Sequence, residues 1–348
     1  MELALYCPDC GYYEKEEDII GKHGDFYTSV SVGSLFGELL AFQFAAWLES
    51  ELGGEGPPAR VIFAEAGAHD GRLAGDVLSW MRDWRREIYD RLEYVIVEPS
   101  PRRREWQQHN LADFRGVVRW VPEISVLKTD LYSSPAIIFS NELLDAIPVR
   151  RVAWDAKARQ WFEWGVALQA DRFVWSRMND IEADVLRFAF QGIDLGKLQE
   201  ILPDGFTTEL NPAAETLWRE AAATLKTGKL LTIDYGLSAE EFFIPERKEG
   251  TLRAYHDHHL TSDLLAIPGQ QDITAHVNFS AIQNAGARAG LRTEELISQA
   301  EFLTKILAST SRQAGRFGDW NPSRTRQFQT LTHPEHLGRP FRVLVQSR

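Results

Sequence analysis

The chain has 348 residues, of which 44% are hydrophobic and 25% are charged, and its formal net charge is −12. This is enough apolar material for one large domain or two modest ones without cross-links. An acidic surface repels phosphate backbones, so we expect no nucleic-acid binding. The most apolar stretch, 39–48, is too short to span a membrane, and no signal peptide is visible, so we expect a cytoplasmic protein without membrane insertion.

Two short motifs raise the question of a metal. Cys7-Pro8-Asp9-Cys10 is compatible with a redox pair or with half a zinc site, and residues 255–259 read Tyr-His-Asp-His-His. No second cysteine pair follows the first, and no βαβ unit precedes it. We therefore expect reduced cysteines and no metal site.

From residue 61 onward, short apolar runs alternate with helical patterns. Strands are expected at 61–64, 94–97, 117–121, 136–139, 230–233 and 341–345. A polar helix is expected after Pro101. Asn211 suits a helix N-cap and Pro212 the first helical position, with an end near Leu225 before Gly228. Near-continuous apolar strands separated by helices predict an α/β fold, with a mainly parallel sheet covered by helices on both faces.

Residues 150–205 interrupt this alternation. The runs 151–154 and 160–164 look like antiparallel strands around Lys157, and 53–58 is the clearest linker. We therefore expect four segments: an N-terminal helical cap (1–55), a Rossmann-like cofactor-binding core (56–149), an inserted antiparallel substrate region (150–205), and the remainder of the core sheet with an irregular insertion (206–348).

The turn after the first strand reads Glu65-Ala66-Gly67-Ala68-His69-Asp70-Gly71. Glycines at this place let a ligand approach the backbone near a helix N-terminus. The spacing differs from the GxGxxG of dinucleotide turns and suits a ligand with an amino-acid end, whose ammonium Glu65 can hold. Glu98 ends the second strand and can bind ribose hydroxyls, a feature that NAD enzymes share. The alternative is an ordinary β–α connection.

Several long motifs occur in one order along the chain: residues 24–29 (Gly-Asp-Phe-Tyr-Thr-Ser), 35–38, the glycine turn, 97–100, 141–149 (Asn-Glu-Leu-Leu-Asp-Ala-Ile-Pro-Val), 233–236, 250–255, 268–279 and 331–334. In these motifs the chain resembles the MidA/NDUFAF7 methyltransferases over nearly its whole length. The resemblance implies a class I methyltransferase fold with S-adenosylmethionine as methyl donor. Mitochondrial relatives are associated with respiratory-complex assembly and protein-arginine methylation, so the resemblance favours a protein substrate with an arginine acceptor, and a small molecule is the alternative.

The sequence departs from the family pattern in two places. His69 stands where the family has glycine, and a strained or crowded backbone there would weaken or reshape cofactor binding. The chain also begins inside a segment that relatives precede with a further helix, which leaves the completeness of its start open. No sequence feature indicates the oligomeric state.

We expect Thr28, Ser29, Glu65, Gly67, His69, Gly71 and Glu98 to bind the cofactor. Thr28 and Ser29 would cap its carboxylate. Asn141, Glu142 and Asp145 follow the fourth strand, where carboxylates could grip an arginine guanidinium. The alternative is that Asn141 caps the turn and Asp145 the next helix.

His276 is the fourth expected catalytic residue, at the acceptor, and a structural histidine is its alternative. Two other functions stay open at this stage. One is an NAD-dependent oxidoreductase that shares the sheet. The other is a non-catalytic assembly factor that kept the fold, which His69 motivates.

Overall fold

The computed structural model describes residues 1–15, 28–50, 60–128, 130–132, 134–181, 186, 190, 193–256, 259–261, 263–313 and 315–348. The linker at 53–58, the first four residues of the 24–29 motif, and Asp257 and His258 lie outside them. The chain divides into two compact units. The first comprises Met1–Ile19, Leu144–Trp218 and Gly236–Ala285, and the second Ile20–Leu143, Arg219–Tyr235 and Gly286–Arg348.

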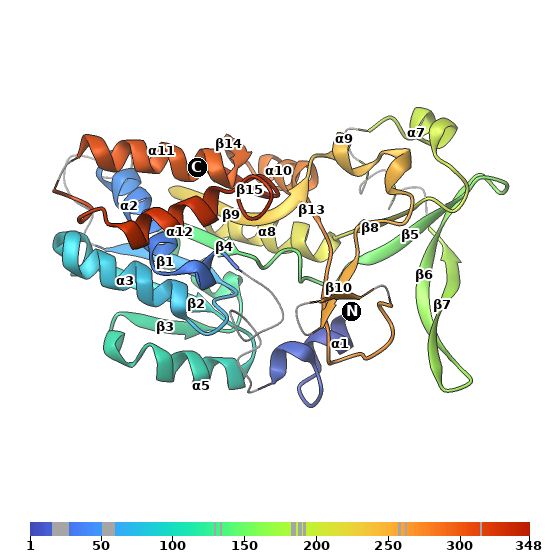
Figure 1. Ribbon diagram of the computed structural model, residues 1–348, viewed down its shortest axis with the longest axis horizontal. Helices are drawn as coiled ribbons and strands as arrows, with labels where there is room; N and C mark the ends of the chain where they lie inside the picture. Colours follow the sequence, from blue (N-terminus) through green and yellow to red (C-terminus); the bar gives the residue numbers. More distant parts are fainter. Residues whose placement is uncertain are drawn as a thin grey trace. The chain divides into compact units, whose positions relative to one another are not determined.

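The second unit is built on a sheet whose strands run in the order β14-β15-β9-β4-β1-β2-β3 (Figure 1). Strands β3, β2, β1, β4 and β9 are parallel, and β15 and β14 pair antiparallel beyond them. Every residue of β1 and β4 is buried, so both faces of this sheet are covered. The bounds are β1 Val61–Ala66, β2 Leu92–Val97, β3 Val118–Val121, β4 Ala136–Asn141, β9 Gly228–Leu237, β14 Arg292–Ser298 and β15 Phe341–Ser347.

The six strands expected from the sequence are confirmed within a few residues. The β14 strand was not expected, because its sequence, RTEELIS, holds only two large apolar residues and none of its residues is fully buried. The mainly parallel sheet is confirmed, and its last strand in the chain, β15, runs antiparallel to β9.

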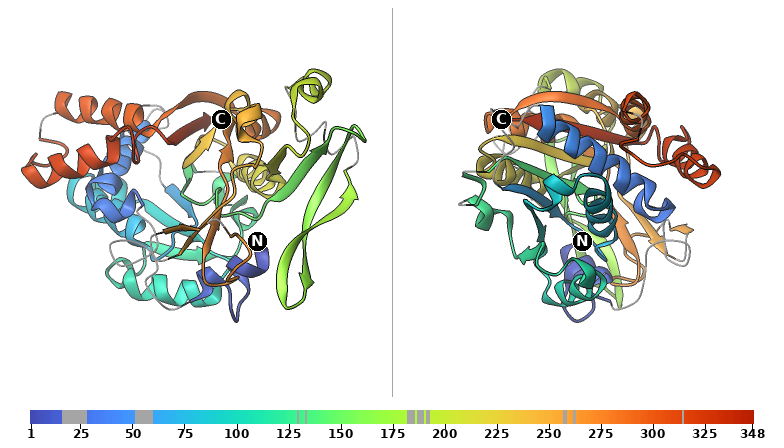
Figure 2. Two further views of the ribbon diagram at one scale, coloured as in Figure 1. Left: turned by 45° about the vertical axis from the view of Figure 1, so that its right-hand side comes forward. Right: turned by 90° about the vertical axis from the view of Figure 1, so that its left-hand side faces the viewer.

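Helix α2 (Leu35–Ser50) contains the most apolar stretch of the sequence and is buried along most of its length. Phe44 of this helix packs on Phe63 and Phe139 of the sheet, with ring centroids 5.3 and 5.0 Å away. Residues of α11 and α12 join the same hydrophobic core, and Figure 2 shows these helices beside α2. The helices of this unit are α2, α3 (Arg72–Trp84), α4 (Arg86–Tyr89), α5 (Pro101–Asn110), α11 (Gln299–Arg312) and α12 (Pro322–Thr332). Among the described residues, no helix is long and apolar enough to cross a membrane.

Two helices run from one unit into the other, α8 (Pro212–Thr224) and α10 (Phe279–Arg288). The expected start of α8 is confirmed, since Asn211 Oδ1 accepts a hydrogen bond from the backbone N–H of Ala214 at 2.9 Å.

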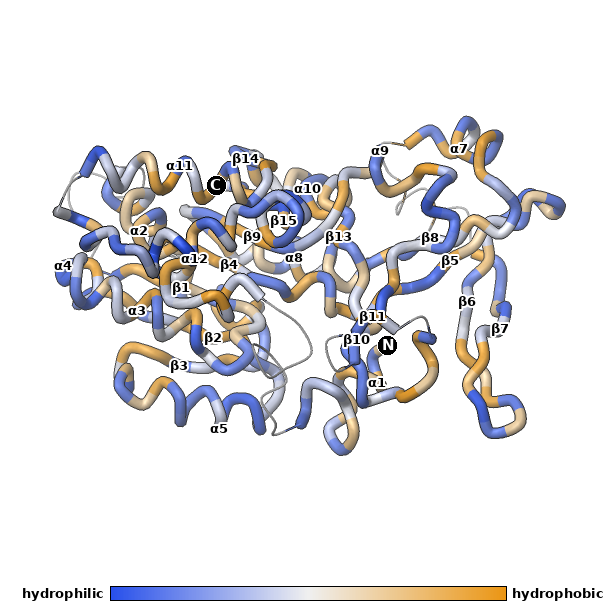
Figure 3. Tube along the Cα trace, viewed as in Figure 1, coloured by the Kyte–Doolittle hydropathy of each residue, from blue (hydrophilic) through white to orange (hydrophobic). Residues whose placement is uncertain are grey.

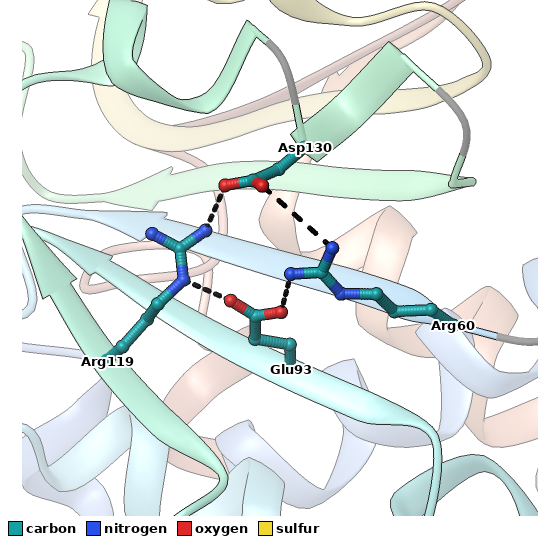
Figure 4. A network of polar contacts seen from close by, with 4 residues as sticks. All are labelled: Arg60, Glu93, Arg119 and Asp130. Carbon is teal, nitrogen blue, oxygen red and sulfur yellow. Dashed lines mark hydrogen bonds and ion pairs between the residues drawn. The ribbon is translucent and has the colours of Figure 1, made fainter.

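The N-terminal ends of the parallel strands are tied by four charged side chains (Figure 4). Arg60 and Arg119 both bind Glu93 of β2, and Arg119 also binds Asp130. Arg60 lies 3.9 Å from the same aspartate. This network lies at the end of the sheet opposite the glycine turn, so it is structural.

The first unit contains an antiparallel sheet in the order β7-β6-β5-β8. The expected antiparallel pairing of residues 151–154 with 160–164 is confirmed. Its core surrounds Trp154 and Trp161, whose ring centroids lie 5.7 Å apart. The strands are β5 Arg150–Asp155, β6 Gln160–Gln169, β7 Arg172–Asp180 and β8 Thr207–Leu210; helix α7 (Leu195–Ile201) lies between β7 and β8, and α9 (Ala239–Phe242) comes later in the chain.

A second small sheet in the first unit has the order β11-β10-β12. It packs against the N-terminal segment, where Leu5 and Tyr12 join Ala254 and Ile273 in a separate core. Tyr13 donates a hydrogen bond to Asp272 at 2.7 Å. The elements are α1 Glu2–Tyr6, β10 Arg253–His256, β11 His259–Thr261, β12 Asp272–Thr274 and β13 Val277–Asn278, which pairs with the end of β9.

Candidate cofactor site

The site lies in the second unit, where the neighbouring strands β1 and β4 end side by side. The chain after β1 continues to β2 on one side of the pair, and the chain after β4 returns to the sheet at β9 on the other side. Ligands of open α/β sheets bind at this point of the strand order. Gly67 follows β1 with φ +75°, and a Cβ at this position would stand 2.6 Å from Leu143 Cδ1, just beyond β4. Gly71 has φ +84°, and its Cβ would lie 3.0 Å from Leu111. The turn therefore needs glycine at both positions, and it brings bare backbone to the start of α3.

His69 adopts a left-handed conformation, with φ +48°. Its ring packs edge-to-face on Trp106 of α5, with centroids 5.2 Å apart, and its Nδ1 lies 3.8 Å from Asp70 Oδ1. Its carbonyl accepts a hydrogen bond from Gln107. Contacts with Trp106, Asp70 and Gln107 therefore fix the position of His69.

Glu65 of β1 is 2% exposed and accepts a hydrogen bond from the Tyr94 hydroxyl of β2. Burial raises the pKa of this carboxyl to about 7, and the bond from Tyr94 only partly opposes the rise. A ligand ammonium beside it would favour the ionised carboxylate. Tyr94 reads as an ordinary core residue in the sequence, so its contact with Glu65 was not foreseen.

Glu98, after β2, is 5% exposed. One carboxylate oxygen accepts a hydrogen bond from the backbone N–H of Ser100 at 3.0 Å. The other accepts a hydrogen bond from Gln107 Nε2 at 3.1 Å. The same Gln107 nitrogen donates to His69 O at 2.9 Å, and its amide oxygen accepts Trp120 Nε1 at 2.9 Å. Gln107 thus joins the glycine turn to the acidic end of β2. One glutamine in a polar helix carries no sequence signal for this role.

Thr28 and Ser29 form a turn that contacts the end of β4. The backbone N–H of Ser29 donates to Glu142 Oε1 at 2.9 Å, and Asn141 Nδ2 donates to the same oxygen at 3.1 Å. Ser29 Oγ donates to Gln299, which in turn donates to the Leu331 carbonyl. Thr28 exchanges hydrogen bonds with Ser31. The structure therefore brings the expected cofactor cap together with Asn141 and Glu142, two of the four expected acceptor residues.

Two features at the end of β4 are unusual. Glu142 has φ +51°, a conformation that costs a non-glycine residue on the order of 1–3 kcal/mol. Asn141 Oδ1 is buried, and within the described part of the chain it has no hydrogen-bond donor. A buried acceptor without a donor is costly unless a ligand supplies one.

Asp145 and His276 belong to the first unit. Asp145 is 5% exposed, and its carbonyl accepts the backbone N–H of Ala275 at 2.9 Å. No helix begins in the fully described stretch between β4 and β5, so the alternative that Asp145 caps a helix is wrong. Burial, with the nearby Arg253 and Arg247, lowers the pKa of His276 to about 4, so its imidazole is neutral at pH 7. Its backbone N–H donates to Thr251 Oγ1.

The cysteines are free, and the described residues include no cluster of three or more histidine, cysteine or acidic side chains that could hold a metal. His256 lies 2.8 Å from the Gln270 carbonyl through Nδ1.

The residues of the second unit suit S-adenosylmethionine. Gly67 and Gly71 form a tight, positive-φ turn packed against Leu143 and Leu111, Glu65 is a buried carboxyl whose ionisation a cation would favour, and Glu98 suits a pair of hydroxyls. Asn141 Oδ1 adds an acceptor in need of a donor.

Comparison with known proteins identifies the family. Residues 39–297 match the family described as "Putative S-adenosyl-L-methionine-dependent methyltransferase". The chain belongs to this family. Its cofactor is S-adenosylmethionine, and the fold is that of the class I methyltransferases, with additional antiparallel sheets.

The structural match is close over the whole length. A crystal structure from Burkholderia thailandensis, bound to S-adenosyl-homocysteine, is 31% identical and superposes with a TM-score of 0.80, covering 100% of this chain and 86% of that one. A native structure from the same organism gives 30% identity and a TM-score of 0.78, with 100% and 85% coverage.

Curated relatives are more distant. The protein arginine methyltransferase NDUFAF7 homolog of Drosophila melanogaster is 25% identical, with 99% of this chain and 79% of the relative covered. The human protein arginine methyltransferase NDUFAF7 is 27% identical, with 98% and 77% covered. Both are named as mitochondrial proteins.

Proposed function

We propose that the protein transfers a methyl group from S-adenosylmethionine to an arginine side chain of a partner protein. The observation that carries this proposal is the end of β4, where Glu142 is held in a left-handed conformation beside the buried, donor-poor Asn141. Strained non-glycine residues persist where the surrounding structure imposes them, and they concentrate at functional sites. The arginine methyltransferase names of the curated relatives favour the same acceptor.

In this proposal the cofactor-binding residues are those of the second unit. Gly67, Gly71 and the backbone of His69 would border the methionine end, and Glu65 would balance its ammonium. Glu98 would hold the ribose, while Thr28 and Ser29 would close over the carboxylate. The bound cofactor supplies an electrophilic methyl group on a sulfonium, so the chain itself has mainly to place and orient the acceptor.

Carboxylates suit a guanidinium acceptor because they bind it through paired hydrogen bonds and localise its charge. We assign this role to Glu142, with Asn141 orienting its carboxylate through the 3.1 Å hydrogen bond. The catalytic roles of Asp145 and His276, and the role of residues 150–205 as a substrate region, stay predictions. A neutral His276 could accept a hydrogen bond from an N–H donor, consistent with its pKa of about 4.

Isotopically labelled S-adenosylmethionine, added with the purified protein to an extract of host cells, tests the proposal. Mass spectrometry should find label on arginine in one or a few proteins. Glu142→Gln keeps an oxygen to accept the Ser29 N–H but removes the charge, so we expect labelling to fall at least tenfold while cofactor affinity stays within about threefold. Label on lysine or on a small molecule would refute the arginine assignment.

The identity of the labelled protein also tests the partner. A component or assembly intermediate of a respiratory complex would agree with the family resemblance. If cofactor binds but nothing is labelled, with or without added membranes, the protein is not a transferase under these conditions and the assembly-factor alternative replaces the proposal.

A further inference from the structure

The two cysteines of the chain, Cys7 and Cys10, lie at the two ends of one tight turn in the first unit. The backbone N–H of Cys10 donates a hydrogen bond to the Cys7 carbonyl at 3.3 Å, which closes a β-turn through Pro8 and Asp9. Such a turn keeps the Cα atoms of its ends within about 7 Å, and a disulfide needs Cα atoms about 4.4–6.8 Å apart. The turn therefore places the two thiols within reach of each other.

The chain on both sides of this turn is held in place by the rest of the first unit. Tyr6 donates a hydrogen bond to the Ala146 carbonyl at 2.9 Å, and Tyr13 donates one to Asp272 at 2.7 Å. Figure 3 shows hydrophobic and hydrophilic stretches in the segment around α1, whose buried side chains share a small core with β10 and β12. The fold therefore holds the cysteines together, beyond what their separation in the sequence imposes.

Two glycines pack against the backbone of the turn. A Cβ at Gly11 would stand 2.6 Å from the Cys7 nitrogen, and a Cβ at Gly269 would stand 2.3 Å from the Cys10 carbonyl oxygen. The backbone of the turn is thus enclosed on two sides, whereas the side chain of Cys7 is half-buried and that of Cys10 is exposed. The thiols are therefore fixed in position and accessible to a dissolved reactant.

The two thiols have different surroundings. A hydrogen bond from the Cys10 thiol lowers the pKa of Cys7, and the backbone N–H groups of Asp9 and Cys10 act in the same direction, while the Asp9 carboxylate opposes them. The hydrogen bond to Cys7 raises the pKa of Cys10. The thiolate is the nucleophile in thiol–disulfide exchange. Cys7 is therefore the cysteine that attacks first, and Cys10 is the one that resolves the intermediate.

We propose that Cys7 and Cys10 form a redox-active dithiol that exchanges with low-molecular-weight disulfides such as oxidised glutathione. The Cys7 thiolate attacks one sulfur of that disulfide, which forms a mixed disulfide and releases a thiolate. Cys10 then loses its proton and attacks the Cys7 sulfur, which closes the Cys7–Cys10 disulfide and releases a second thiolate. The released thiolates take up the two protons that the protein thiols lose, so one small disulfide is reduced as two protein thiols are oxidised.

Reduced glutathione reverses the exchange by attacking the Cys7–Cys10 disulfide. Exposed disulfides are the more easily reduced ones, which suits a pair that cycles between two states. The reduced cysteines expected from the sequence are one of these states.

Glutathione buffers with different ratios of the oxidised to the reduced form measure the exchange. After quenching with an alkylating reagent, the reduced chain carries two alkyl groups and the disulfide form carries none, because the chain has only these two cysteines. Mass spectrometry of the intact chain separates the forms. We expect complete conversion as the ratio rises, with an equilibrium constant at least tenfold larger for the folded protein than for the chain unfolded in guanidinium chloride, because the fold holds the turn.

Serine variants separate the roles of the two cysteines. Cys10→Ser keeps a hydroxyl that can donate to Cys7, so Cys7 should form a stable mixed disulfide with glutathione at a rate within about threefold of the first step in the wild type. Cys7→Ser leaves only Cys10, whose attack at neutral pH should be at least tenfold slower. Circular dichroism and cofactor binding confirm that each variant is folded.

Three results would each overturn the proposal. One is a folded wild-type protein that takes up two alkyl groups at every glutathione ratio. Another is an equilibrium constant that is no larger for the folded protein than for the unfolded chain. The third is an equal rate of mixed-disulfide formation in the two serine variants.

Discussion

At the scale of single residues, the site is defined by groups that fit poorly into a protein without its ligand. Burial raises the pKa of Glu65, Glu142 holds a strained backbone, and Asn141 Oδ1 has no donor among the described residues. Each of these costs folding free energy. The sequence could predict Glu65, Glu98 and the two glycines, because their chemistry follows from position after a strand. It could not predict Tyr94 or Gln107, whose roles depend on which side chains the fold brings near.

Replacing Glu65 with a neutral residue should raise the stability of the cofactor-free protein and weaken cofactor binding. The pKa of Glu65 is about 7 in the folded protein and 4.5 as a reference, so the folded state holds a proton that the unfolded state releases between these values. The stabilisation from this proton is complete below pH 4.5 and is lost as the pH rises through 7. Glu65→Gln should therefore stabilise the cofactor-free protein at pH 8 by about 2 kcal/mol, while weakening cofactor binding at least tenfold.

Thermal unfolding between pH 5 and 8 and calorimetry of cofactor binding measure the two effects. Glu105→Gln, on the exposed surface of α5, is the matched control and should alter neither. A Glu65→Gln protein that binds S-adenosylmethionine as well as wild type would show that the carboxylate does not hold the ammonium.

At the scale of elements, the apolar strands were predictable and the polar ones were not. Strand β1 shows its burial in the unbroken apolar run of its first four residues, and α8 shows its start in Asn211 and Pro212. The strand β14 and the small sheet β11-β10-β12 lack such signals, since much of their surface is polar or only half-buried. Pairing with a neighbour, rather than local pattern, decides that they are strands.

Helix α5 illustrates how an element with little apolar surface can order a site. Gln107 is its one fully buried residue, and it binds the glycine turn, Glu98 and Trp120 at once. Gln107→Ala should remove one hydrogen bond from each of these groups, lower the free energy of unfolding by about 1–3 kcal/mol, and weaken cofactor binding at least tenfold.

Gln108→Ala is the matched control. It removes a glutamine side chain one residue further along the same helix, at an exposed position. We expect this substitution to change cofactor affinity by less than a factor of two. The free energy of unfolding should change by less than about 0.5 kcal/mol. Chemical denaturation and calorimetry on the two variants provide the comparison. Equal effects of the two substitutions would mean that Gln107 does not organise the site.

At the scale of the whole molecule, the expected cofactor-binding residues all belong to one compact unit. That unit holds the parallel sheet, the glycine turn and Glu98, and the chain passes between the two units several times. Cofactor binding should therefore need no residue of the other unit, whereas Asp145 and His276 would concern the acceptor alone. A loss of transfer without a loss of cofactor affinity is the expected signature of variants in the first unit.

Calorimetry of S-adenosylmethionine binding to the wild-type protein tests the central claim most directly. The account predicts one cofactor per chain, and no measurable binding to Gly67→Val, whose side chain would collide with Leu143. Absence of binding to the wild-type protein, together with binding to His69→Gly, would contradict the account and show that His69 closes the site.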